Sequence, residues 1–173
     1  MKEEVGVRIS DAGPDERPRL EPILEESFEG WYLRHSRSTL YGIPTVRVAE
    51  VDGRAVGLAM LKSLERGVGY VYYIAVAKDS RRMGFGSRLL DDALDYFRGV
   101  GVETVYASVE NEEAAALFRS KGFAKTHFGE VVSSYGLIRA LAMYRSMVVV
   151  PGEVLLRLDL DEGRRDTKSS SRA

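Results

Sequence analysis

One stretch, residues 69–98, constrains the fold most, because its periodicity changes at a short glycine-containing turn. Residues 70–77 are aromatic, aliphatic and uncharged, which is typical of a strand buried on both faces. After Gly84 the apolar residues follow helical spacing and the charged residues occupy the other side. The apolar stripe consists of Phe85, Leu89, Leu90, Ala93, Leu94 and Phe97. The sequence therefore predicts a buried strand, a tight turn and an amphipathic helix that ends at Gly99 and Gly101.

The turn at residues 81–87 has the chemistry of an anion site. Backbone N–H groups in the first turn of a helix have no carbonyl partner within it, and the helix dipole makes that end positive. Arg81 and Arg82 add two cationic side chains, while Gly84 and Gly86 allow a ligand to approach the backbone closely. These features favour an anionic group such as a pyrophosphate, although similar turns also occur in proteins that bind nothing.

Two common phosphate-binding loops do not fit this turn. A dinucleotide fingerprint needs a third glycine at the position that Leu89 occupies. A P-loop needs Gly-Lys-Ser or Gly-Lys-Thr, and the turn contains neither. Another kind of anion-binding loop is therefore expected.

The composition is that of a soluble globular protein. Of 173 residues, 45% are hydrophobic and 29% are charged, which fits one domain over residues 1–160 followed by a polar tail, 161–173. No apolar run is close to the length of about 18 residues that a membrane-spanning helix needs. The acidic start of the sequence is unlike a signal peptide. We therefore expect a cytoplasmic protein without a membrane partner. The formal net charge of −1 disfavours nucleic acid as a partner.

Amides and sulfur are scarce in this chain. It has no cysteine and no glutamine, two histidines, and Asn111 as its one asparagine. We therefore expect no disulfide, no zinc site or other metal, and no cysteine nucleophile. Few thermolabile residues beside many charges indicate a thermophilic source, with genome base composition as the alternative reason for the arginine content.

The rest of the chain alternates between strand and helix patterns. Strands are expected at residues 5–10, 45–51, 55–64, 103–109, 123–132 and 153–160, and helices at 15–28 and 112–121. Residues 30–41 fit a short helix or an ordered loop, and residues 133–147 fit a helix weakly. The apolar segment 147–160 could pair between subunits as an exposed sheet edge would, which leaves a homodimer open.

A second motif begins at Asn111 and continues with Ala114, Leu117, Phe118 and the pair Gly122-Phe123. Together with the Arg-x-x-Gly-x-Gly loop formed by Arg81, Gly84 and Gly86, this pattern resembles the GNAT superfamily of acyl-CoA-dependent N-acetyltransferases. The order and spacing of the two motifs agree over about half of the chain. Each residue also has a structural explanation, since asparagine caps helices and glycine ends them.

The resemblance implies an α/β fold: a mixed, mostly antiparallel sheet with a splayed parallel pair, flanked by helices. It implies acetyl-CoA as cosubstrate, with the pantetheine arm on the main chain of Ile74, Ala75 and Val76. The pyrophosphate would lie on Arg81, Arg82, Met83, Gly84, Phe85, Gly86 and Ser87. Asn111 and Phe118 would lie at the thioester end.

The implied reaction is direct attack on the thioester by a primary amine, in a ternary complex without a covalent enzyme intermediate. The acceptor, a small-molecule or peptide amine, is left unassigned. The sequence departs from the family at both proton-handling positions. Phe118 replaces a tyrosine that serves many members as general acid, and Tyr70 stands where histone-type members have a glutamate base.

Several residues could substitute for the missing acid and base. Tyr70 and Tyr72 are two residues apart, on one face of the expected strand, and could flank the acceptor amine. His127 is a further candidate on the strand expected at 123–132. Trp31 and Tyr32 fall where the family builds an acceptor-binding lid, but could equally be packing anchors. The alternatives to an enzyme are a non-catalytic acyl-CoA-binding or regulatory module and a nucleic-acid- or partner-binding scaffold.

Overall fold

The computed structural model describes residues 6–160, which form two compact units. The first contains the described chain up to Lys62 together with Val71–Ala93, and the second contains Ser63–Tyr70 and the described chain from Leu94 onward. Strands β3 (Arg54–Glu65) and β4 (Val68–Val76) and helix α3 (Phe85–Gly99) contribute to both. The division thus runs through secondary-structure elements rather than a linker, and the expectation of one domain stays a prediction.

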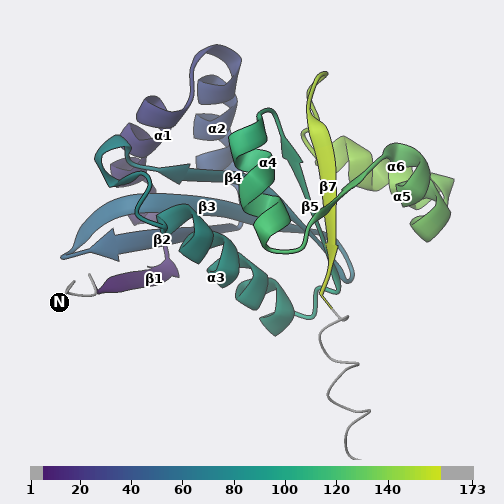
Figure 1. Ribbon diagram of the computed structural model, residues 1–173, viewed down its shortest axis with the longest axis horizontal. Coiled ribbons are helices and arrows are strands. Elements are labelled where there is room, and N and C mark those ends of the chain that lie inside the picture. The colour runs from purple at the N-terminus through teal and green to yellow at the C-terminus, as the bar shows by residue number, and fades with distance from the viewer. Residues whose placement is uncertain (1–5, 161–173) are drawn as a thin grey trace, which may run out of the picture. The chain divides into compact units, whose positions relative to one another are not determined.

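Seven strands form a mixed sheet in the order β1-β2-β3-β4-β5-β7-β6 (Figure 1). The other strands are β1 (Val7–Asp11), β2 (Thr45–Val51), β5 (Thr104–Val109), β6 (Ala124–Thr126) and β7 (Val154–Asp159). Antiparallel pairing joins β1 to β2, β2 to β3, β5 to β7 and β6 to β7, and the sheet has one parallel pair. This confirms the predicted α/β class with a mostly antiparallel sheet flanked by helices.

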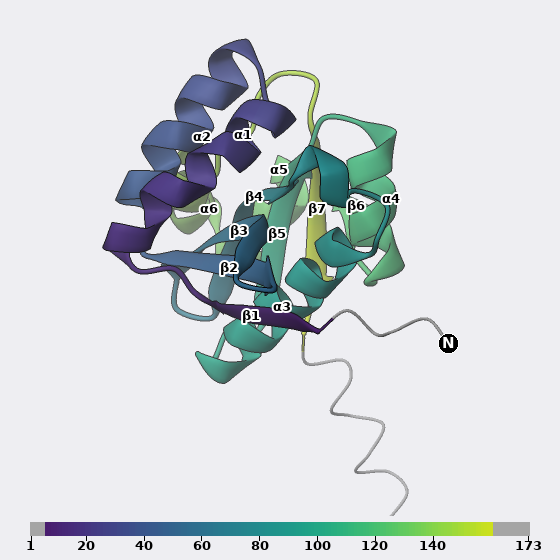
Figure 2. The same cartoon turned by 90° about the vertical axis from the view of Figure 1, so that its left-hand side faces the viewer.

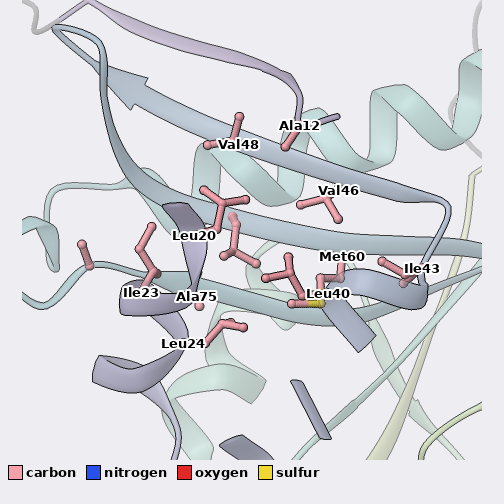
Figure 3. Close-up of a cluster of buried hydrophobic side chains, with 12 residues drawn as sticks. Ala12, Leu20, Ile23, Leu24, Leu40, Ile43, Val46, Val48, Met60 and Ala75 are labelled. Atoms are coloured by element: carbon pink, nitrogen blue, oxygen red, sulfur yellow. The ribbon is translucent and has the colours of Figure 1, made fainter. Parts of the chain in front are cut away.

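In the first unit, one face of the sheet is covered by η1 (Pro14–Leu20), a 3₁₀ helix, and by α1 (Glu21–Ser27) and α2 (Gly30–Gly42). Leu20, Leu24 and Leu40 of these helices are fully buried against alternate residues of the strands (Figure 3). The strand residues are Val46 and Val48 of β2, Leu58 and Met60 of β3, and Ala75 of β4. Their period of two places one side of each strand in this core.

Helix α3 begins on the opposite face of the first unit's strands (Figures 1 and 2). A Cβ added at Gly57 of β3 would lie 2.9 Å from Leu89 Cδ1 and 3.0 Å from the carbonyl oxygen of Ala75. Arg47 of β2 donates two hydrogen bonds to Asp92, of 2.7 and 2.9 Å. The close approach needs glycine, and the ion pair fixes the helix along β2.

The second unit packs three helices around β5 and β7, namely α4 (Glu112–Ser120), α5 (Phe128–Tyr135) and α6 (Leu137–Ser146). Figure 1 shows α4 on one side of these strands and the α5–α6 pair on the other. At the beginning of β4, a Cβ on Gly69 would lie 2.6 Å from Cε1 of Phe97. Glycine at this position therefore lets the ring of α3 lie directly against the strand.

Most of the predicted elements are present, including the strands at 45–51, 55–64 and 103–109 and the helix at 112–121. Residues 30–41 are a helix, α2, and most of residues 133–147 form α6. Among the described residues, no helix combines the length and the apolar character that crossing a membrane requires. The tail at 161–173 lies outside the described residues.

Three expectations were wrong. The helix at 15–28 is divided into η1 and α1, because Pro18 and Pro22 have no N–H to continue an α-helical ladder. The strand at 123–132 spans only Ala124–Thr126, because Phe128, Val131, Val132 and Tyr135 follow helical spacing and form α5. His127 therefore precedes a helix rather than lying on a strand.

The third correction concerns segment 147–160. Its strand, β7, pairs with β5 through Val154–Asp159 and with β6 through Leu155–Arg157. Over Leu155–Arg157 this strand has a neighbour on both sides and presents no free backbone edge. The exposed sheet edge expected for pairing between subunits is therefore absent over Leu155–Arg157, and a homodimer stays a prediction.

A buried arginine ties η1 to the end of α2. Arg17 is only 6% exposed, and its Nη1 donates hydrogen bonds of 2.8 Å to the carbonyl oxygens of both Leu40 and Ile43. A third bond runs from Nη2 to the carbonyl of Pro44 at 3.4 Å. The carbonyl end of a helix is partly negative, so this site compensates a buried cation with backbone dipoles.

We predict that Arg17→Met lowers the free energy of unfolding by about 2–4 kcal/mol, because buried carbonyl groups lose charged donors. The matched control is Arg19→Met on the same 3₁₀ helix, where the side chain makes surface ion pairs with Glu16 and Glu50. That control should cost less than about 1 kcal/mol. Urea denaturation of both variants measures the difference, and equal losses would contradict the role assigned to Arg17.

Candidate functional site

The turn between β4 and α3 reverses the chain within a few residues. After β4 ends at Val76, the short 3₁₀ helix η2 (Lys78–Ser80) leads to residues 81–84, and α3 begins at Phe85. Two residues of the turn have positive φ, Arg82 at 62° and Gly84 at 84°. A non-glycine residue rarely adopts this left-handed conformation, so Arg82 is held there by its surroundings.

The N–H groups in the first turn of α3 have no carbonyl partner within the helix. The first i to i−4 bond of the helix is donated by Arg88 to the carbonyl of Gly84, at 3.1 Å, so the N–H groups of residues 85–87 precede it. The first turn contains no acidic side chain. A Cβ added at Gly84 would meet no atom within 4 Å in the part of the chain that the structure describes. The backbone here is open to an anionic ligand.

The guanidinium of Arg81 makes hydrogen bonds within the chain. Its Nε donates to the carbonyl of Val76 at 3.1 Å, and its Nη2 donates to the carbonyl of Glu26 at 2.8 Å and to Ser27 Oγ at 3.4 Å. The guanidinium therefore ties the turn to the end of α1. Glu26 reinforces this tie, since its carboxylate accepts the N–H of Lys78 at 2.7 Å. Arg81 shapes the loop, and Arg82 is the other exposed arginine of the motif.

A hollow of about 460 Å³ lies beside the turn. It is lined by Val51, Asp52, Arg54, Val56, Asp79, Ser80, Met83 and Phe85. Arg54 and Asp79 form an ion pair of 2.5 Å on its wall, and the hydrogen bond from Arg54 lowers the pKa of Asp79. Met83 is exposed while Phe85 is buried, so the phenyl ring anchors the start of α3.

The strand residues expected to contact a pantetheine arm are half-buried or buried. Ile74 and Val76 are half-buried and Ala75 is buried. The carbonyl of Val76 already accepts the hydrogen bond from Arg81. Tyr72, on the same strand, is half-buried against the core of the first unit, and burial raises its pKa. Its phenol therefore stays protonated at neutral pH.

A cluster of ring side chains joins α2 to β4, and of its members the sequence singled out Trp31 but not His35 or Tyr73. The Nδ1 atom of His35 lies 2.7 Å from the hydroxyl of Tyr73, and the ring of Trp31 stacks on His35 with 4.8 Å between centroids. Phe28 meets the ring of Tyr73 edge-on at 5.1 Å. The available signal was helical spacing, because Trp31 and His35 are four residues apart and so share one helix face.

Tyr70 lies in the second unit and is 1% exposed. Its hydroxyl lies 2.8 Å from Ser108 Oγ and 3.3 Å from the carbonyl of Val148. Ser108 in turn lies 2.9 Å from Glu153 Oε2. The structure therefore places Tyr70 in a buried hydrogen-bonding network.

The second motif also lies in the second unit. Asn111 caps α4 by accepting the N–H of Ala114 at 2.9 Å, and Phe118 is buried edge-on against Phe123 at 5.1 Å between ring centroids. His127 is exposed and lies 3.7 Å from Glu130. Across residues 6–160, no group of three or more His, Cys, Asp or Glu side chains is arranged to hold a metal ion.

Comparison with known proteins gives the family of the chain. Residues 9–123 match the model of the acetyltransferase (GNAT) family. An amino-acid acetyltransferase of Neisseria meningitidis is 30% identical over 126 residues, which cover 71% of this chain but 28% of that protein. The chain thus aligns with less than a third of the length of this relative.

Two solved structures show the same fold. N-acetylglutamate synthase from Neisseria gonorrhoeae, complexed with coenzyme A and N-acetyl-glutamate, superposes with a TM-score of 0.63 and 26% identity over 91% of this chain and 36% of that one. The ribosomal-protein-S18-alanine N-acetyltransferase of Escherichia coli gives a TM-score of 0.67 at 20% identity, over 90% and 94%. With both motifs present and the family match extending over more than half of its length, the chain belongs to the acetyltransferase (GNAT) family.

Proposed function

We propose that the protein transfers the acetyl group of acetyl-CoA to a primary amine by direct attack in a ternary complex. The observation that carries this proposal is the open first turn of α3, the next α-helix after β4, in a chain of the acetyltransferase (GNAT) family. The bound N-acetylglutamate synthase complex shows coenzyme A in one similar protein. By analogy, we propose that this chain also binds coenzyme A.

The pyrophosphate is assigned to the backbone of residues 82–87. Helix N-termini bind anions because their free N–H groups and the helix dipole act together. The left-handed residues Arg82 and Gly84 lie in the loop that leads into this helix. Arg82 is exposed and is proposed to add a positive charge. Arg81 contributes by fixing the loop to α1.

The pantetheine arm is assigned to the main chain around Ile74 and Ala75. An extended arm can accept and donate hydrogen bonds along a strand as a further strand would. Val76 contributes less than expected to this proposal, because its carbonyl is bonded to Arg81. The assignment of Asn111 and Phe118 to the thioester end stays a prediction.

The acceptor is proposed to be an amine of a small molecule or a peptide. Two similar proteins are named for such acceptors, an amino acid in one and the alanine of a ribosomal protein in the other. An amine with a pKa near 10.4 is almost fully protonated at pH 7, and freeing its lone pair costs about 4–5 kcal/mol. The enzyme therefore needs a route by which the proton leaves the nitrogen.

The first test is calorimetric titration of the protein with acetyl-CoA. Gly84→Glu should weaken binding at least about tenfold relative to Gly84→Ala, which corresponds to about 1.4 kcal/mol. Both variants carry a Cβ at a φ of +84°, so strain is matched and only glutamate adds bulk and a negative charge at the pyrophosphate site. Equal affinities for the two variants would contradict the assigned loop.

The second test is release of CoA thiol in the presence of a panel of amines: amino acids, polyamines and peptides with free N-termini. We expect release with at least one amine and a matching acetylated product by mass spectrometry. Acetyl-CoA binding without release on any amine would instead support a non-catalytic acyl-CoA-binding module. Buried Phe118 in place of the family's acidic tyrosine is the observation that favours that alternative.

A further inference from the structure

Helix α2 and strand β4 bring a histidine and a tyrosine into hydrogen-bonding contact in the first unit. His35 Nδ1 and the hydroxyl of Tyr73 are 2.7 Å apart. Both side chains are half-buried, so the pair is held by its neighbours yet still reached by solvent. Tyr73 is next to Ile74 on β4, the strand proposed to bind the pantetheine arm. One member of the pair, Tyr73, is thus on the strand that is proposed to bind the cofactor.

The neighbours of His35 carry no charge of their own. They are Trp31, which stacks on the ring, Thr39, whose Oγ1 lies 3.4 Å from Nδ1, and Tyr73. From α1, which packs on α2, the acidic groups Glu21 and Glu25 pair with Arg37. Burial lowers the pKa of His35 below its usual 6.5. The imidazole is therefore neutral at pH 7 and has a lone pair available to accept a proton.

We propose that Tyr73 and His35 form the proton-accepting pair of the acetyl transfer, which supplies the base that the position of Tyr70 lacks. The inference rests on the proposed function. In the neutral pair, the Tyr73 hydroxyl donates to His35 Nδ1, and the other ring nitrogen carries the hydrogen. The phenol oxygen then offers a lone pair to the N–H of an approaching amine.

The reaction transfers two protons from the acceptor nitrogen. One ammonium proton of the acceptor passes to Tyr73 Oη while the Tyr73 proton passes to His35 Nδ1, which leaves a neutral amine, a neutral phenol and an imidazolium. The nitrogen lone pair forms the C–N bond to the thioester carbonyl carbon, and the C–S bond breaks with its electron pair on sulfur. A second nitrogen proton goes to the thiolate, and His35 returns the first proton to solvent. The products are the amide, CoA thiol and one proton.

A purely structural role for the same residues makes different predictions. The cluster of Phe28, Trp31, His35 and Tyr73 packs α1 and α2 on β4, so large truncations would loosen the unit. Tyr73→Phe removes only the hydroxyl and keeps the ring that Phe28 contacts. His35→Gln keeps a polar side chain of similar reach but cannot carry the proton. These two variants separate packing from proton transfer.

The experiment measures acetyl-CoA affinity, melting temperature and kcat with the panel amine that gives the most thiol release. Tyr73→Phe and His35→Gln should each lower kcat about 100-fold, the usual contribution of general-base catalysis, at unchanged acetyl-CoA affinity. The double variant should be no slower than the slower single one, because the two groups act as a unit. Tyr41→Phe is the matched control, since its side chain is exposed.

Two further readouts would not respond to a packing defect. The pair accepts a proton only while His35 is neutral, so kcat of the wild type should fall as the pH drops through the lowered pKa of His35. This fall of kcat at low pH should be absent from His35→Gln. The chain has two histidines, so NMR titration against His127→Gln assigns the ring of His35. Tyr73→Phe should raise the pKa of His35, because the lost hydrogen bond favoured the neutral ring.

The outcomes distinguish this inference from the proposed function. If the wild type turns over and both variants keep kcat within about twofold, the pair is overturned and the acetyltransferase proposal stands. If the variants lose kcat only together with a lower melting temperature, and kcat of His35→Gln still falls at low pH, these residues have a packing role. The proposed proton-accepting pair is then overturned. If the wild type binds acetyl-CoA but acetylates no amine, the proposed function and the pair both fail.

Discussion

The structure depends on how the chain passes from β4 to α3. Two left-handed residues, Arg82 and Gly84, lie in the connection of residues 77–84 between the strand and the first turn of the helix. Arg81 anchors this connection by donating hydrogen bonds to the carbonyl oxygens of both Val76 and Glu26. The helix that follows begins with N–H groups that have no partner within it. On the proposed function, the first turn of α3 binds the pyrophosphate of the cofactor and strand β4 binds its extended pantetheine arm.

Arginine serves this protein mainly as a structural cation. Arg17 binds the carbonyl end of α2, Arg47 holds α3 through Asp92, and Arg81 ties the loop to α1. The planar guanidinium suits these tasks because it donates in several fixed directions and always stays charged. In the loop this leaves the backbone and Arg82, rather than Arg81, as the proposed binding groups for an anion. On this proposal, the motif arginine Arg81 contributes by fixing the loop to α1.

The sequence predicted what local patterns determine. The strand, turn and helix at 69–98 follow from a change in hydrophobic period, and the caps at Asn111 and Gly122 follow from side-chain chemistry. It failed at residues 128–135, where a short apolar run fits two periods, and at 15–28, where prolines break an amphipathic pattern. The contact between His35 and Tyr73 joins residues 38 positions apart. No local pattern predicts such a pair, because it depends on how α2 packs on β4.

The most direct measurement is a crystal structure of the protein with acetyl-CoA bound. The account predicts pyrophosphate oxygens within hydrogen-bonding distance of backbone N–H groups of residues 82–87, with the guanidinium of Arg81 still on the carbonyls of Val76 and Glu26. It also predicts the pantetheine arm beside Ile74 and Ala75. A pyrophosphate bound elsewhere, with this turn left to solvent, would contradict it.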